Sequence, residues 1–406
     1  MKILIVNHYS GSAELGMEYR HYYLAKELQS LGHQVCIVAS RFSHLRMHQP
    51  GRQGGWSEHC GIPHLWLAGC PYNGNGARRL VNMVGFSDSL WRNAGTIAKE
   101  QKPDLVLASS PHPFSAYGAA RLARIAGARF VFEIRDLWPL SLMELGSMTA
   151  RNPLIRLLDH AEAYGCNHAD KVISLLPCVH DYLARRNVRE DKWTVIPNGV
   201  LLSEWEEPWA NVPAPALEVL NTLRADGYSL VGYAGNHGQA NALDTFIDAA
   251  SRVGDEKVAF VLVGGGPEKA RLQRRVQAEG LRNVRFLDPV RKEHIPLLLQ
   301  WFDVAYIGLE RQPLFRFGIS PNKLTDYMMA GRPVLKAIDS GNDVVRDAGC
   351  GLTVAPEDPQ AVVDGVRKLL ALGPEERRVM GLRGREYVVK NHSYSVLARQ
   401  FLAECT

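Results

Sequence analysis

The feature that most constrains the fold is an alternation of short apolar runs with longer amphipathic segments, which occurs twice along the chain. In the first half the run KILIVN at residues 2–7 leads into a helical pattern and a second run, QVCIVAS, at 34–40. In the second half SLVGYAG at 229–235 and VAFVLVG at 258–264 repeat that order. Apolar strands that alternate with helices indicate parallel sheets covered on both faces. We therefore predict two Rossmann-like α/β domains in tandem.

Chain length and the joining segment agree with two domains. At 406 residues the chain exceeds what one hydrophobic core usually supports. Residues 199–215 (GVLLSEWEEPWANVPAP) are acidic and contain several prolines, which is typical of an interdomain linker. We place the first domain at 1–198 and the second at 199–385. Residues 41–80 are rich in His, Gly, Pro and Trp, and we expect little regular structure there.

Composition excludes several protein classes. Apolar residues make up 46% of the chain and charged residues 22%, which is usual for a folded globular protein and excludes disorder. The seven cysteines are scattered without C-x-x-C spacing, so we expect reduced thiols in a cytoplasmic protein and no zinc site. No apolar run is long enough to span a membrane, and no signal peptide is expected at the start.

The net charge of +5 is concentrated in the first half. Residues 1–200 hold 22 Lys and Arg against 16 Asp and Glu, whereas residues 201–406 hold 25 against 26. A basic first half suggests an anionic partner. No motif for reading nucleic acid is present, so we expect no nucleic-acid partner. The segment Arg78–Arg92 could lie at an anionic membrane surface, with Phe86 and Trp91 inserted, or it could be an ordinary amphipathic helix.

Polar residues follow the predicted strands of the first half, where ligands bind in open α/β sheets. His112 follows one strand, and Arg135 and Asp136 follow another. Arg135 and Asp136 could equally form a structural ion pair. The loop after the first strand contains Gly16, and Arg20 lies near the start of the next helix. The loop carries no G-x-G-x-x-G fingerprint, so it is not a dinucleotide-binding motif. It either permits close approach of another ligand or is simply a flexible surface loop.

In the second half, the helix after Phe317 carries a lysine where the helix dipole disfavours one. Ser320 is a good N-cap and Pro321 suits the first helical position. Lys323 would then lie in the first turn, which makes more sense if an anion binds there. Glycine turns follow two other strands, at Gly235-Asn236 and at 264–266. Together these features predict a nucleotide diphosphate site rather than a solvated lysine. Proline after the third glycine excludes a dinucleotide motif.

These residues are similar to a known family over essentially the full chain. The matching stretches are VIPNGV, YAGN, VGGGPE, NVRFLDPV and DYMMAGRPV. They resemble the retaining GT-B glycosyltransferases of family 4. RDLWP, SPNK and YRHYYLAKEL are similar to a bacterial branch that builds surface polysaccharides, O-antigen among them, and includes N-acetylfucosamine transferases. The resemblance implies two domains that face each other across a deep cleft, with a C-terminal helix (386–406) returning to the first domain.

The resemblance also implies a donor, most simply a UDP-N-acetylhexosamine, bound mainly by the second domain. Asp326 matches the last acid of an E-x7-E element that contacts the ribose, but Gly318 stands in place of the first acid. The usual Arg and Lys after the Y-A-G strand are absent, so Lys323, with Arg316 and Arg20 behind it, is expected to neutralise the diphosphate. The expected donor-binding residues are Gly235, Asn236, Gly264, Gly265, Gly266, Arg316, Ser320, Pro321, Asn322 and Asp326.

The expected mechanism relies on placement and charge stabilisation. The acceptor hydroxyl attacks C1 from the face that the diphosphate leaves, and Lys323 with the glycine amides stabilises the departing charge. Arg135 or Asp136 orients the acceptor or the sugar, and Gly16, Arg20 and His112 are expected to bind a lipid-linked or saccharide acceptor. No D-x-D occurs in the chain, so we expect no metal and no other cofactor.

Three other functions fit parts of the sequence. An NDP-sugar 2-epimerase of the same fold would work without an acceptor. A non-catalytic sugar-nucleotide binding protein would show no turnover. An NAD-dependent oxidoreductase is weakened by the absence of the dinucleotide fingerprint.

Overall fold

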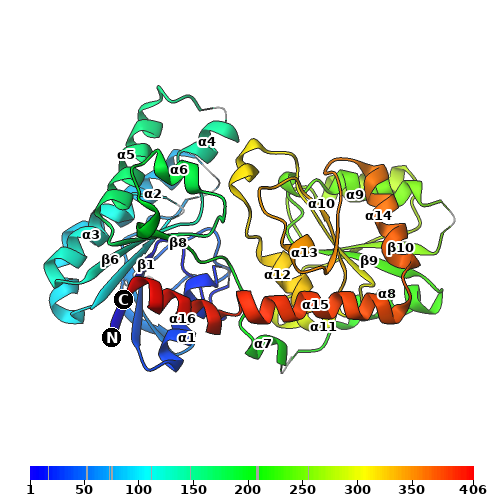
Figure 1. Cartoon of the computed structure of the whole chain (residues 1–406), viewed down its shortest axis with the longest axis horizontal. Helices are drawn as coiled ribbons and strands as arrows, with labels where there is room; N and C mark the ends of the chain where they lie inside the picture. Colours follow the sequence, from blue (N-terminus) through cyan, green and yellow to red (C-terminus); the bar gives the residue numbers. More distant parts are fainter. Residues whose placement is uncertain are drawn as a thin grey trace. The chain divides into compact units, whose positions relative to one another are not determined.

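The computed structural model divides the chain into two compact units (Figure 1). It describes all residues except 17, 52–53, 73, 75, 111, 147, 207–209 and 255. Unit 1 comprises Met1–Asn198 and Tyr394–Thr406, and unit 2 comprises Gly199–Ser393. Each unit is built on its own mainly parallel sheet, so the predicted pair of Rossmann-like domains is confirmed.

Unit 1 contains an eight-stranded sheet in the order β3-β4-β2-β1-β5-β6-β7-β8. Neighbouring strands run parallel except at β3–β4, which pair antiparallel. The chain leaves β1 towards β2 on one side and later returns to place β5 on the other, so the strand order reverses beside β1. The strands are β1 (Lys2–Asn7), β2 (Gln34–Ser40), β3 (Gly55–His59), β4 (Ile62–Leu67), β5 (Leu105–Ser109), β6 (Arg129–Ile134), β7 (Lys171–Ser174) and β8 (Trp193–Val195).

The hairpin β3–β4 corrects the prediction that residues 41–80 hold little regular structure. β4 pairs parallel with β2, and its side chains His64, Leu65 and Trp66 are buried. β3 is largely exposed and polar, as suits an edge strand. The sequence signal was weak because Pro63 and His64 interrupt the apolar pattern of β4, and β3 (GWSEH) has no apolar pattern.

Helices cover both faces of the first sheet (Figure 1). Successive residues of β6 show the two faces, because a Cβ on Gly165 of α5 would meet the Phe132 ring at 2.9 Å, whereas Glu133 bonds to residues of α1. The helices are α1 (Arg20–Ser30), α2 (Ala77–Gln101), α3 (Ser115–Ala126), α4 (Leu140–Glu144), α5 (Pro153–His168), α6 (His180–Ala184), the 3-10 turn η1 (Glu190–Lys192) and α16 (Tyr394–Cys405).

Unit 2 contains a six-stranded, wholly parallel sheet in the order β11-β10-β9-β12-β13-β14. The order reverses between β9 and β12, which pair directly. A ligand crevice in such a sheet lies outside the carboxyl ends of the strands at this reversal. The strands are β9 (Ser229–Ala234), β10 (Val258–Val263), β11 (Val284–Leu287), β12 (Val304–Gly308), β13 (Val334–Ala337) and β14 (Gly351–Thr353).

Two apolar clusters hold the helices of unit 2 against opposite faces of its sheet. One joins the sheet to α8, α11, α12 and α15, and the other joins it to α9, α10 and α14. The helices and 3-10 turns are α7 (Ser203–Glu206), α8 (Ala214–Ala225), η2 (Gln239–Asn241), α9 (Leu243–Arg252), α10 (Lys269–Ala278), η3 (Lys292–His294), α11 (Ile295–Leu299), η4 (Pro313–Phe317), α12 (Asn322–Met329), α13 (Val344–Asp347), α14 (Pro359–Ala371) and α15 (Pro374–His392).

The units divide between residues 198 and 199, where the sequence analysis placed the boundary, but the two segments that join them differ from their description there. The proposed linker 199–215 contains α7 and the start of α8 and belongs to unit 2, while its residues 207–209 lie outside the described part of the chain. The C-terminal segment that joins unit 1 begins at Tyr394 rather than at 386, because α15 continues through His392 as part of unit 2.

Candidate functional site

The candidate donor site of unit 2 lies at the carboxyl ends of β9 and β10 and at the start of α12. β9 borders the reversal of strand order, and α12 follows β12 on the other side of it. The site therefore has the position that the fold favours for a ligand. The predicted residues Gly235, Asn236 and Lys323 meet there, and the glycines at 264–266 pack directly beside them.

The glycine turns after β9 and β10 are packed against each other. Gly264 has φ +143°, and a Cβ on it would lie 2.0 Å from the Gly235 carbonyl oxygen. Gly266 has φ +148°, and its Cβ would lie 2.5 Å from the His237 carbonyl oxygen. Only glycine fits either position. The Gly235 amide donates to the Val263 carbonyl at 2.9 Å, and the Gly264 amide donates to the next strand at 3.2 Å.

This packing corrects part of the predicted anion site. We expected the glycine amides to stabilise a departing diphosphate, but those of Gly235 and Gly264 already donate to backbone carbonyls. The two glycines instead allow the β9 and β10 turns to approach closely. They place the turn that carries Asn236 and leave room for a side chain above Gly235.

Lys323 occupies that room. Its ammonium donates to the Tyr233 hydroxyl at 2.8 Å and to Oδ1 of Asn241 at 2.5 Å, and its Cε would lie 3.0 Å from a Cβ on Gly235. Burial lowers the pKa of Lys323 to about 8. Among the ion pairs of the described residues, none brings a carboxylate to Lys323. A cation held in a polar setting without a counter-charge suits an anionic ligand.

The start of α12 differs from the prediction by one position. The helix begins at Asn322, so Pro321 occupies the N-cap position that we assigned to Ser320, and no side chain caps the helix. The reason is that Pro321 has φ −76° and ψ 129°, an extended conformation rather than a helical one. Lys323 remains in the first turn. Tyr327 ties α12 to the end of β9, since its hydroxyl bonds to both the amide and the carbonyl of Ala234.

The remaining donor candidates lie around this helix. Asp326 forms an ion pair with Lys292 at 2.6 Å, a partner that the sequence did not indicate. Arg316 is exposed in η4 and donates to the Pro313 carbonyl at 2.6 Å while its guanidinium lies over the Phe317 ring. Gly318, which stands where the E-x7-E pattern of the resembled family predicts an acid, has φ +86°, so the backbone there favours glycine.

In unit 1, Arg135 and Asp136 follow β6 as predicted, but they do not pair with each other. Arg135 forms an ion pair with Glu18, and Asp136 is exposed. Burial alone would lower the pKa of the Arg135 guanidinium, but the Glu18 carboxylate raises it. Glu18 has φ +67°, which is rare for a residue with a side chain and often marks a functional position.

Arg20 contradicts the expectation that it binds phosphate or acceptor. Its Nε and Nη2 donate to Glu133 at 3.0 and 2.7 Å, and its other N–H groups donate to the carbonyls of Pro197 and Ile196 and to the side chain of Asn198. The side chains of Arg20 and Glu133 are 4% and 1% exposed. All donors of the guanidinium are used inside unit 1, so Arg20 is a structural residue.

Glu133 is the centre of this buried network. It also accepts hydrogen bonds from His21 at 2.8 Å and from Ser109 at 2.7 Å. Burial by itself would raise the pKa of Glu133, but Arg20 and His21 hold it well below its ordinary value. The network joins β5, β6, α1 and the end of β8, and it supports the turn that carries Arg135.

The two other acceptor candidates are also buried. His112 bonds to His8 at 2.9 Å, and His8 bonds to Asn82 at 2.6 Å. Burial and the nearby Arg79 lower the pKa of His112 to about 3, so it is neutral. Gly16 has φ +77° and closes a turn in which its amide donates to Ser12 at 2.8 Å. The structure therefore shows packing roles for His112 and Gly16 and places neither at an exposed surface.

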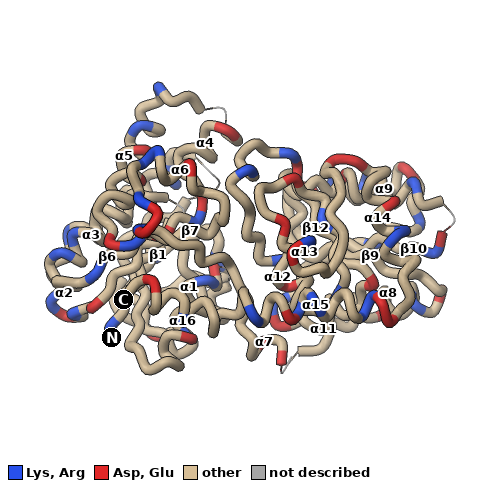
Figure 2. Tube along the Cα trace, viewed as in Figure 1, with Lys and Arg blue, Asp and Glu red and all other residues tan. Residues whose placement is uncertain are grey.

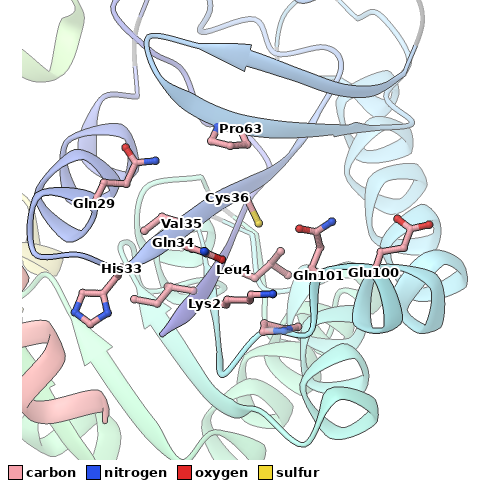
Figure 3. Close-up of a pocket in the computed structure, with 12 residues that line it drawn as sticks. Lys2, Leu4, Gln29, His33, Gln34, Val35, Cys36, Pro63, Glu100 and Gln101 are labelled. Atoms are coloured by element: carbon pink, nitrogen blue, oxygen red, sulfur yellow. The ribbon is translucent and has the colours of Figure 1, made fainter.

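Unit 1 also contains a cavity of about 370 Å³, and none of its lining residues is a predicted site residue (Figure 3). It is lined by Lys2, Leu4, Gln34, Cys36 and Gln101, at the amino ends of β1 and β2 and the end of α2. The carboxyl ends of the strands, which carry Arg135 and Asp136, are at the opposite edge of the sheet. This cavity is thus no part of the candidate site.

Four residues of the site escaped the sequence analysis: Tyr233, Asn241, Glu18 and Lys292, the partner of Asp326. Tyr233 looked like an ordinary strand residue, and Asn241 lay in a loop without any recognisable spacing. Glu18 preceded a helix and could be linked to Arg135 only through the tertiary fold. The sequence did hold one signal for the network around Arg20. Glu133 is a charged residue inside the apolar run RFVFEI, and a buried charge needs a partner.

Comparison with known proteins gives the same two-part division. A model described as a glycosyl transferase 4-like domain matches residues 16–199, and one for glycosyl transferases group 1 matches residues 229–372. WcaI of Escherichia coli K12, named for colanic acid biosynthesis, is 28% identical over 331 residues, 80% of this chain and 79% of that protein. O-antigen chain mannosyltransferase C of Escherichia coli is 27% identical over 44% of this chain and 45% of its own length.

Solved structures share the fold at low identity. Sucrose-phosphate synthase from Thermosynechococcus elongatus has a TM-score of 0.74 at 19% identity and covers 99% of this chain and 97% of its own. Anabaena HepE in complex with UDP-glucose has a TM-score of 0.67 at 16% identity, over 99% of this chain and 98% of its own.

Proposed function

The chain belongs to the GT-B glycosyltransferases, with a 4-like domain followed by a group 1 domain, and we propose that it transfers a sugar from a nucleoside diphosphate sugar with retention of the anomeric configuration. The donor we propose is a UDP-N-acetylhexosamine. The acceptor we propose is a lipid-linked or oligosaccharide intermediate of surface polysaccharide synthesis. The names of the colanic acid and O-antigen relatives support that role, and the UDP-glucose complex of a structural neighbour supports a uridine nucleotide.

The observation that carries the proposal is the position of Lys323. Its ammonium lies at the carboxyl end of β9, held by two neutral oxygen acceptors. A diphosphate leaving group gains negative charge as the bond to the sugar breaks, and a preorganised cation stabilises that charge more in the transition state than in the ground state. Lys323 is therefore assigned to the diphosphate. Asp326, on the same helix, is assigned to the ribose, with Lys292 holding its carboxylate.

In unit 1 the exposed Asp136 and the adjacent Arg135 are assigned to the acceptor or the sugar. A carboxylate at this position accepts hydrogen bonds from sugar hydroxyls. Glu18 holds the guanidinium of Arg135, so the turn has a fixed arrangement before any ligand arrives. Because no D-x-D occurs in the sequence, we further propose that the diphosphate is neutralised by protein cations and that transfer needs no divalent metal.

The donor assignment is tested by binding. UDP-, GDP- and dTDP-sugars are titrated calorimetrically into the wild type and into Lys323→Ala, with Lys368→Ala as the control, since Lys368 is an exposed lysine of unit 2. Loss of a charged hydrogen bond is worth about 1.5–3 kcal/mol, so Lys323→Ala should weaken binding roughly 10- to 150-fold, and Lys368→Ala should leave it unchanged. If no nucleotide sugar binds the wild type, or if both variants bind alike, the assignment is wrong.

We also propose that α2 contacts an anionic membrane at the cytoplasmic face, where a lipid-linked acceptor would be found. Val81, Val84 and Trp91 are 60%, 47% and 40% exposed, and Arg78 and Arg92 are exposed on the same helix. Phe86, which the membrane alternative would have inserted, is fully buried in the core of unit 1. Among the described helices none has the length and apolar character needed to cross a membrane.

Vesicle co-sedimentation tests this surface. Figure 2 shows acidic and basic positions interspersed along both units, so binding must depend on local arginines rather than on a long basic run. Each arginine near an anionic surface contributes about 1 kcal/mol, so Arg78→Ala/Arg92→Ala should reduce binding to phosphatidylglycerol vesicles about 30-fold. Arg383→Ala/Arg385→Ala, in α15 of unit 2, is the matched control. Equal binding by the two double variants would contradict the proposal.

A further inference from the structure

A closed ring of hydrogen bonds surrounds the ammonium of Lys323. Lys323 contacts Tyr233 at 2.8 Å and Asn241 at 2.5 Å. The Tyr233 hydroxyl and the Asn241 amide then both reach the carbonyl oxygen of Asn236, at 2.6 and 3.1 Å. The ring thus runs from the lysine through two side chains to a single backbone oxygen.

The chemistry of the groups fixes the direction of every bond in the ring. An ammonium can only donate, so the Tyr233 oxygen and Oδ1 of Asn241 accept from Lys323. A backbone carbonyl can only accept, so the Tyr233 hydroxyl and Nδ2 of Asn241 donate to Asn236. Each group therefore has one consistent role. Replacing either side chain would leave a donor or an acceptor of the ring without a partner, which is costly in a partly buried site.

The ring uses two of the three N–H bonds of the ammonium. Both acceptors are neutral, so the positive charge is oriented without being cancelled. The third N–H has no acceptor among the hydrogen bonds of the described residues. A phosphoryl oxygen would supply both that acceptor and the missing counter-charge.

Ala242, which directly follows Asn241, has a strained backbone conformation. Ala242 has φ +47° and ψ 41°, a left-handed conformation that is unfavourable for alanine. It ends the turn η2, which carries Asn241, and leads directly into α9. Strain of this kind persists only where the surrounding structure holds it, and it is concentrated at functional positions.

We propose that Tyr233 and Asn241 are positioning residues that hold the ammonium of Lys323 above Gly235 with one N–H directed to a phosphoryl oxygen of the donor. The inference rests on the proposed function, because it assigns a role in binding the same diphosphate. The neutrality of Asn241 is the key property: a carboxylate there would form an ion pair with Lys323 and cancel the charge that the donor needs.

The test is a double-mutant cycle of nucleotide binding. The nucleotide diphosphate that the wild type binds most tightly among UDP, GDP and dTDP is titrated into Asn241→Asp, Lys323→Ala and the double variant. Gln277→Glu, an exposed amide-to-acid change on α10, is the control for net charge. Asn241→Asp should weaken binding at least tenfold in the wild-type background and clearly less in Lys323→Ala, where only the direct repulsion between the new carboxylate and the diphosphate remains.

A pH series separates positioning from a merely structural role. In the wild type, affinity should fall as pH rises through the pKa of Lys323, near 8. Asn241→Asp adds a negative partner and should shift that fall to higher pH, which a general loss of structure would not do. Should Asn241→Asp fail to fold, Tyr233→Phe provides the second variant, with weaker binding expected only when Lys323 is present.

The outcomes distinguish the two proposals. Failure of the wild type to bind any of the three nucleotides overturns both the proposed function and this inference. Binding by the wild type with unchanged affinity in Asn241→Asp and Tyr233→Phe overturns the inference alone. Equal losses in the presence and absence of Lys323 would also overturn it.

Discussion

Replacement of Arg20 by alanine separates a structural role from a ligand contact. The guanidinium donates to Glu133 through two N–H groups and to the carbonyls that follow β8 through others. Arg20→Ala would leave the Glu133 carboxylate buried, with His21 and Ser109 as its remaining partners among the described residues. Removing one partner of a buried ion pair costs about 3–5 kcal/mol, because the other charge is left uncompensated.

The expected size of the effect follows from the size of unit 1. A domain of 150–250 residues loses about 2–4 °C of melting temperature per kcal/mol. The unfolding transition of unit 1 should therefore move down by roughly 6–20 °C in Arg20→Ala. Because the pKa of Glu133 is depressed in the folded state, its contribution is present above the pKa of an unfolded glutamate and is lost as pH falls through the lower folded value.

Scanning calorimetry of the full chain is the assay. Arg92→Ala is the matched control, since its side chain is 76% exposed and pairs with Asp88 one turn away. Exposed pairs contribute at most about 1 kcal/mol, so the control should melt close to the wild type. A variant Arg20→Ala that melts like the wild type but binds donor or acceptor weakly would refute the structural assignment and restore the original prediction.

Three further predictions concern the donor site. Gly264→Ala should destabilise unit 2 and abolish nucleotide binding, because its Cβ would lie 2.0 Å from the Gly235 carbonyl oxygen. Urea unfolding measures the stability and a nucleotide titration measures the binding. Wild-type values in both assays would contradict the packing described for the glycine turns. Nucleotide affinity should weaken above pH 8 as Lys323 loses its proton, a trend that should be absent from Lys323→Ala. Transfer should continue in EDTA, and an activity that is lost in EDTA and restored by magnesium would refute the metal-independent proposal.

The sequence predicted the sheets well because buried parallel strands are continuous apolar runs. Both strand–helix alternations follow from that pattern, whereas the strand order and the position of each reversal come from the structure. The hairpin β3–β4 could not be predicted in this way. Its edge strand is polar, and the neighbouring β4 is buried only because it pairs with β2. Edge elements of this kind depend on tertiary pairing more than on local pattern.

Only part of the candidate site could be predicted from the sequence. A lysine in the first turn of a helix pointed to an anion, and Lys323 does lie at the favoured edge of the sheet. The partners that hold it, Tyr233 and Asn241, are 90 and 82 residues away in sequence. Nothing in a single sequence indicates such pairings. The prediction for Arg20 was wrong for the same reason. A basic residue near the start of a helix gives no sign, in the sequence alone, that it will pair with a buried glutamate 113 residues away.

The central claim is that this chain transfers sugar from a nucleotide donor whose diphosphate is held by Lys323. Its most direct test is a transfer assay with labelled UDP-N-acetylhexosamine and a lipid-linked acceptor, run with wild type and Lys323→Ala, with the product anomer determined. The account predicts a product with the donor's anomeric configuration and a kcat reduced about 10²- to 10³-fold in Lys323→Ala. Epimerisation of the donor without an acceptor, or transfer by Lys323→Ala at the wild-type rate, would contradict it.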